Sequence, residues 1–171
     1  MDVLYLVRHG ETEWNRQRRM QGRLDSPLTP EGRAHARMNG QLLARETVGQ
    51  MIVSPLGRTR ETAELILEGC DIPVTYDARL VERHCGEWEG LTIDEIADQY
   101  PDEWAARSLD PFHHRPPAGE NLPDMLLRIA PAAPGGGGVG GFLTDSGAAT
   151  LWVAWSAETR TVRAAAEGWD G

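Results

Sequence analysis

The apolar residues of this chain gather in short runs, and the first two runs both lead into arginine. Residues 4–10 (LYLVRHG) begin with four apolar positions and end in Arg8, His9 and a glycine. Residues 51–53 (MIV) form a second run, and a short turn separates them from Arg58. A short apolar run closed by turn residues predicts a buried strand. The chain therefore has two predicted strands with arginines at or just beyond their carboxyl ends.

Helical periodicity follows each of these strands. Thr29 precedes a proline, which fits an N-cap and the first helical position. In the helix that begins there, Ala34, Met38, Leu42 and Leu43 are expected to face the core. The predicted elements are strands over 4–7, 51–53 and 72–76 and helices over 30–46, 57–68, 93–100 and 123–130.

Strands that alternate with helices indicate the α/β class. We predict a three-layer α/β/α fold with a mainly parallel central sheet, formed by a domain over residues 1–130. Residues 131–147 contain a run of four glycines among further glycines and prolines, which predicts a linker. Residues 148–171 form an atypical tail that we expect to pack on the same domain, with a strand over 150–155 and a weakly amphipathic helix over 157–167.

Length and charge narrow the class of protein. The chain has 171 residues, enough for one domain with a proper core. Its net charge of −9 argues against general binding to nucleic acid or to an anionic membrane. We find no apolar run long enough to span a bilayer and no charged leader region. Cys70 and Cys85 lack metal-type or redox-type spacing, so we expect a cytoplasmic protein.

The polar residues at the strand ends indicate an anion site. The carboxyl ends of parallel strands meet at one edge of a sheet, where ligands bind. Arg8 and Arg58 would therefore converge on one anion, with His9 placed to attack it. All 17 basic residues are arginine, which favours bidentate oxyanion contacts where these residues cluster, although coding bias explains this composition equally well. Asn15 would donate its side-chain amide to a phosphate oxygen.

Five segments in this order resemble the histidine phosphatase superfamily, which includes the cofactor-dependent phosphoglycerate mutases and many phosphomonoester phosphatases. They are residues 6–15 (LVRHGETEWN), 21–32 (QGRLDSPLTPEG), 54–63 (SPLGRTRETA), 80–90 (LVERHCGEWEG) and 117–121 (PAGEN). A lone Arg-His-Gly sequence is weak evidence, whereas five ordered motifs are specific. The resemblance extends over about residues 3–129.

The resemblance implies phosphoryl transfer through a covalent phosphohistidine. His9 would be the nucleophile, and Glu82 would protonate the leaving oxygen. No metal and no cofactor is implied for hydrolysis. The phosphate-binding residues would be Arg8, Asn15, Gln21, Gly22 and Arg58.

The resemblance fails at the second histidine that the family places after a late strand. The histidines of this chain are at positions 9, 35, 84, 113 and 114, and none follows. One phosphate donor and some positive charge are therefore missing, and a loss of this kind costs on the order of 10²–10³ in rate. A frame slip in the coding DNA after Ala130 and natural divergence or truncation of the C-terminus both explain such a tail.

Three functions remain open at this point. Hydrolysis of a small-molecule phosphate ester is favoured, since only 34 residues lie between Glu82 and Pro117, and the mutases carry a longer insertion there. A phosphoglycerate mutase, dependent on 2,3-bisphosphoglycerate, is the alternative, because residues 82–86 (ERHCG) resemble the mutases. A catalytically inactive phosphate-binding protein is the third. The sequence leaves the oligomeric state open, a homodimer included.

Overall fold

The computed structural model describes residues 3–130, 139–144, 149–154 and 161–164, with side chains described over 5–130. Helices and strands alternate through the first half, as predicted. This half contains β1 (Val3–Leu6), α1 (Glu13–Arg16), α2 (Pro30–Leu43), β2 (Met51–Val53), α3 (Gly57–Leu67) and β3 (Val74–Tyr76). Beyond it lie α4 (Ile93–Gln99), α5 (Pro101–Leu109), α6 (Leu122–Ile129), β4 (Val139–Thr144), β5 (Ala149–Ala154) and β6 (Thr161–Ala164).

The described strands pair two by two. β1 runs parallel to β6, with Leu4 opposite Val162, and β2 runs parallel to β3, with Met51 opposite Val74. β4 and β5 form an antiparallel pair. The α/β class with parallel strand pairing is therefore confirmed, and the described pairs form three separate two-stranded sheets.

The end of the chain departs from the prediction. β5 corresponds closely to the strand expected over 150–155, but β6 occupies 161–164, where we expected a helix. That helix prediction is wrong at these four residues, since β1 offers its edge for parallel pairing and a β-branched pair begins the segment. β4 lies within the segment expected to be a linker, whose residues 131–138 are outside the described residues. The division of the chain into a domain, a linker and a tail stays a prediction.

The contact between α2 and α3 uses small residues. The buried positions of α2 are Gly32, Ala36, Gly40 and Leu43, whereas Met38 is 45% exposed. A Cβ on Gly40 would lie 2.3 Å from the backbone oxygen of Ile66 in α3, so only glycine permits this approach. Of the expected core positions, Ala34, Met38 and Leu42 are therefore wrong and Leu43 is confirmed. Met38 and Leu42 thus lie on the exposed side of α2, whereas Leu43 shares a buried cluster with Ile66 of α3.

Local capping agrees with the sequence. The Thr29 hydroxyl accepts from the Gly32 N–H and begins α2, as predicted. Thr92 and Glu95 form a capping box at the start of α4. Thr12 and Asn15 form another at α1, which the sequence analysis did not predict.

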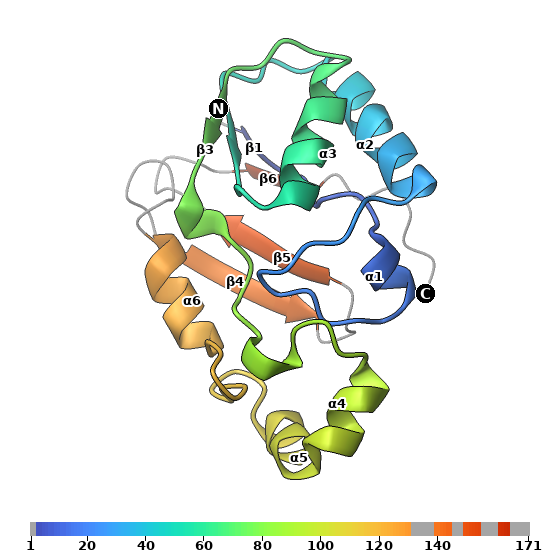
Figure 1. Ribbon diagram of the computed structural model, residues 1–171. Coiled ribbons are helices and arrows are strands. Elements are labelled where there is room, and N and C mark those ends of the chain that lie inside the picture. Colours follow the sequence, from blue (N-terminus) through green and yellow to red (C-terminus); the bar gives the residue numbers. More distant parts are fainter. Residues whose placement is uncertain (1–2, 131–138, 145–148, 155–160, 165–171) are drawn as a thin grey trace.

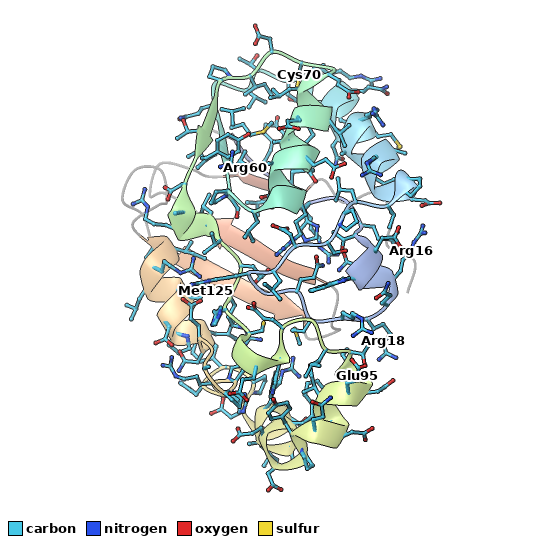
Figure 2. The ribbon with its side chains drawn as sticks, in the orientation of Figure 1. Arg16, Arg18, Arg60, Cys70, Glu95 and Met125 are labelled. Atoms are coloured by element: carbon cyan, nitrogen blue, oxygen red, sulfur yellow. The ribbon has the colours of Figure 1, made fainter. Side chains whose placement is uncertain are left out.

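Different helices form the two opposite ends of the molecule, and the segment that joins α1 to α2 lies between these ends (Figure 1). Figure 1 shows α2, α3 and β3 at one end and α4 and α5 at the other. Figure 2 places Cys70 and Glu95 at these opposite ends, with Arg16 of α1 between them. The second end is held by Trp88, which is fully buried against Cys85 and Ile96. No helix in the described part of the chain is long and apolar enough to cross a bilayer.

Candidate active site

His9 follows the end of β1 and is fixed by the residue after it. Its Nδ1 lies 2.7 Å from the backbone oxygen of Gly10. A carbonyl only accepts hydrogen bonds, so Nδ1 carries the proton and Nε2 of the neutral ring keeps its lone pair. The Gly10 N–H in turn donates to Oγ1 of Thr62 in α3, at 3.0 Å. A strand end and a helix thus orient the imidazole.

The surroundings of His9 keep it neutral. Burial is the largest influence and lowers its pKa, and the charge of Arg58 lowers it further, with a smaller contribution from Arg8. The hydrogen bond to Gly10 and the charge of Asp25 oppose these effects but are outweighed. The resulting pKa is about 4. Near neutral pH, Nε2 is therefore an available nucleophile.

Arg58 lies in the first turn of α3 and is 3% exposed. Its Nη1 donates to the Leu24 oxygen at 2.7 Å and to Oδ1 of Asp25 at 3.0 Å, and its Nη2 donates to the Gly22 oxygen at 2.9 Å. Its buried Nε has no partner among the described residues. A buried N–H without a partner is costly, so this edge of the guanidinium is suited to an anion.

Asp25 closes the N-terminus of α3 from a distant loop. The N-cap residue Leu56 has no side-chain acceptor for the first helical N–H groups. Asp25 supplies it, since its carboxylate accepts from the Gly57 N–H at 2.7 Å and from the Arg58 N–H at 3.1 Å. The same carboxylate therefore caps the helix and holds the arginine that begins it.

Arg8 and Glu82 lie close enough to interact. Burial lowers the pKa of Arg8 most, the charge of Glu82 raises it, and the charge of Arg58 lowers it. Oε1 of Glu82 accepts from the Arg83 N–H at 2.7 Å, which orients the carboxyl group. The charges of Glu82 and Arg58 thus both act on Arg8, and the charges of Arg8 and Arg58 act on His9.

The remaining predicted residues contribute in different ways. Gly22 binds Arg58 through its oxygen, and Gln21 is 8% exposed with a buried, unpartnered Oε1. Asn15 uses Oδ1 to accept from the backbone and hydroxyl of Thr12, and its Nδ2 donates to no described residue. No described contact joins Asn15 to His9, so its role in binding phosphate stays a prediction.

Sequence reasoning missed the supports of the site. Asp25 and Thr62 were recognised as part of motifs but were given no role. The spacing of Arg58 and Thr62 carried a signal, because residues four apart share one face of a helix. Asp25 carried none, since its contacts with α3 depend on the path of the loop.

Among the other described histidines, His84 and His114 make contacts with residues other than His9. His84 Nδ1 lies 2.9 Å from the Ala118 oxygen, and His114 stacks on Trp88 with ring centroids 5.3 Å apart. None of the four is among the groups that most strongly shift the pKa of His9. Among the described residues, no group of three or more histidine, cysteine, aspartate or glutamate side chains is arranged to hold a metal.

A known protein family matches most of this chain. The family model described as histidine phosphatase superfamily (branch 1) matches residues 4–134. The chain belongs to this superfamily. The matched residues include His9, Arg58 and Glu82, and the fold is that of the family, whereas the catalytic roles of these residues stay predictions.

Among the relatives of this chain within the histidine phosphatase superfamily, some are named as mutases and others as phosphatases. A probable phosphoglycerate mutase GpmB of Serratia proteamaculans is 43% identical over 130 residues, which cover 75% of this chain and 60% of that protein. The solved structure of Bacillus stearothermophilus YhfR is 41% identical with a TM-score of 0.70 and covers 76% of this chain and 64% of that one. A mycobacterial glucosyl-3-phosphoglycerate phosphatase is 33% identical with a TM-score of 0.66, covering 76% and 59%. The chain therefore spans about three fifths of the length of the relatives that it matches.

Proposed function

We propose that this chain hydrolyses a phosphomonoester through a phosphohistidine on His9. One observation carries the proposal: the ring donates Nδ1–H to Gly10, no described residue binds its Nε2, and the charges of Arg8 and Arg58 act on it. A neutral imidazole held beside two guanidinium groups is suited to attack a bound phosphate ester. That the family includes phosphatases of known structure supports the proposal.

The reaction proceeds in two steps. Nε2 of His9 forms a bond to phosphorus while the bond from phosphorus to the ester oxygen breaks, and a protonated Glu82 gives its proton to the departing alcohol. Water then attacks the phosphohistidine, Glu82 takes up a proton from that water, and orthophosphate leaves. Arg8 and the free edge of Arg58 stabilise the equatorial oxygens in both steps.

We propose further that catalysis is impaired. Residues 115–171 contain no histidine, so none of them matches the second histidine of the family. The pocket then lacks one donor to the phosphoryl group, and the loss of one such donor costs on the order of 10²–10³ in rate.

A phosphoglycerate mutase is a second candidate, supported by the names of the relatives. The Serratia proteamaculans protein and a Gloeobacter violaceus protein, 41% identical, both bear that name. In this function, 2,3-bisphosphoglycerate would phosphorylate His9, and the phosphoryl group would pass to a phosphoglycerate instead of water. Hydrolysis requires no such cofactor.

A phosphate-binding protein without turnover is the third candidate, supported by the same absence of a second histidine. In all three functions the partner is a small-molecule phosphate ester. Our expectations of a cytoplasmic location and of no nucleic-acid or membrane partner stay predictions. The oligomeric state, with a homodimer among the alternatives, stays open.

Turnover of p-nitrophenyl phosphate tests the proposal. We expect slow hydrolysis that is abolished in His9→Ala and retained in His35→Ala, because His35 is exposed on α2. Conversion of 3-phosphoglycerate to 2-phosphoglycerate, faster than hydrolysis, would support the mutase instead. Phosphate binding without either reaction would support the inactive protein.

A further inference from the structure

Two segments far apart in the sequence meet at Glu89. Its Oε1 accepts from the Arg23 N–H at 3.0 Å and from the Cys85 N–H at 2.9 Å. Arg23 belongs to the loop of residues 21–25, and Cys85 belongs to residues 82–90, the segment that also carries Glu82. One carboxylate oxygen thus joins the loop beside Arg58 to the segment that holds the proposed acid.

The carboxylate is nearly enclosed. The Glu89 side chain is 7% exposed, and Nε2 of His84 lies 3.8 Å from its Oε1. A Cβ on Gly22 would lie 2.1 Å from Oε1 of Glu89, so the loop packs directly on this carboxylate. Gly22 also has a φ of +52°, a left-handed conformation that favours glycine. The loop therefore has a shape that depends on Glu89.

The same loop holds Arg58. Two of the oxygens that bind its guanidinium, those of Gly22 and Leu24, flank the Arg23 N–H that Glu89 binds. A shift of the backbone at Arg23 would move both oxygens. The guanidinium of Arg58 would then lose two of its three acceptors, while Asp25 would still bind its Nη1 and its main-chain N–H.

We propose that Glu89 is a positioning residue, which fixes the 21–25 loop. Through this loop, Glu89 holds Arg58 in place near His9 and keeps the position of Arg58 relative to Glu82 constant. This inference rests on the proposed phosphate site. Glu89 itself touches none of the reacting groups. It acts through two backbone N–H groups and, beyond them, through the carbonyls that bind Arg58.

Three variants of Glu89 separate its acceptor from its charge. Glu89→Ala removes both, and Glu89→Asp keeps the charge but withdraws the acceptor by one methylene. Glu89→Gln loses the charge but keeps an oxygen that can accept from both N–H groups. Glu87→Gln is the matched control, because Glu87 is exposed in the same segment and its carboxylate accepts only from the Tyr100 hydroxyl among the described residues.

The readouts are the pKa of His9, titrated by NMR, and the affinity for orthophosphate. In Glu89→Ala and Glu89→Asp we expect the pKa of His9 to rise above about 4, because the charge of Arg58 acts less strongly on the ring while burial, the largest cause of the low pKa, remains. Orthophosphate affinity should fall by about tenfold or more, as misplaced groups cost up to about 10²-fold. Glu89→Gln should lie close to the unmodified chain, and Glu87→Gln should match it.

A lower melting temperature with an unchanged pKa of His9 and unchanged orthophosphate affinity would overturn the proposal, since Glu89 would then serve stability alone. Equal effects in Glu89→Gln and Glu89→Ala would also overturn it, because the acceptor would not be the important feature. Neither readout requires turnover. If the unmodified chain fails to hydrolyse phosphate esters, the proposed function fails while the role of Glu89 is still tested.

Discussion

Replacing Asp25 with alanine tests how the structure holds its phosphate-binding arginine. The Asp25 carboxylate accepts three hydrogen bonds, from the Gly57 N–H, the Arg58 N–H and Nη1 of Arg58. Among the described residues, the substitution removes the only side-chain cap of α3 and the only carboxylate that binds the buried guanidinium. Arg58 would keep the oxygens of Gly22 and Leu24.

The expected loss of stability follows from these contacts. A lost helix cap costs about 0.5–2 kcal/mol. A lost hydrogen bond to a charged group costs about 1.5–3 kcal/mol. The Asp25 side chain is 36% exposed, so water can replace part of what is lost. We therefore expect the free energy of unfolding to fall by about 2–3 kcal/mol, less than the sum of the two effects.

Urea denaturation at neutral pH, followed by circular dichroism, measures this change. Glu64→Ala is the control, because Glu64 is exposed on the same helix and makes no hydrogen bond or ion pair with any other described residue. The control should change stability by less than about 0.5 kcal/mol. An equally small effect of Asp25→Ala would refute the idea that this carboxylate holds Arg58 and α3 together.

Three further predictions follow from the same site. The pKa of His9 is about 4 in the folded chain and near 6.5 when unfolded, so the acid limb of kcat/KM should lie near pH 4. As the pH falls, the unfolded state protonates His9 near pH 6.5, whereas the folded state protonates it only near pH 4. His9 should therefore lower the free energy of unfolding as the pH falls between these values. Urea denaturation of His9→Ala at the same pH values should lack this contribution. Gly22→Ala should destabilise by about 1–3 kcal/mol, since alanine is strained at positive φ and its Cβ would meet Glu89; equal urea midpoints would argue against this close packing. EDTA should leave turnover of p-nitrophenyl phosphate unchanged, whereas inhibition restored by a divalent metal would contradict a reaction without metal.

Much of the first 130 residues could be predicted because their signals are local. The strand over 51–53 and the caps at Thr29 and Thr92 depend only on nearby residues. The arginine and histidine at the end of β1 were recognisable for the same reason. The buried face of α2 was not, because its contact with α3 depends on the glycines that let two backbones approach.

The supports of the site depend on contacts that are distant in sequence. Asp25 binds residues more than thirty positions away, and Glu89 binds the Arg23 N–H across 66 positions. In the sequence alone, a carboxylate that caps a helix or binds a loop far along the chain cannot be told apart from an exposed surface carboxylate. The strand β6 was missed for a related reason, since its pairing partner is the opposite end of the chain.

The central claim is that His9 accepts a phosphoryl group, and incubation with a ³²P-labelled phosphomonoester tests it most directly. After a rapid quench in alkali, we expect label on the chain that is stable in base, is released by acid and maps to His9. His9→Ala should carry no such label, and His35→Ala should carry as much as the unmodified chain. Hydrolysis of the ester with no label on His9 at any quench time would contradict the account.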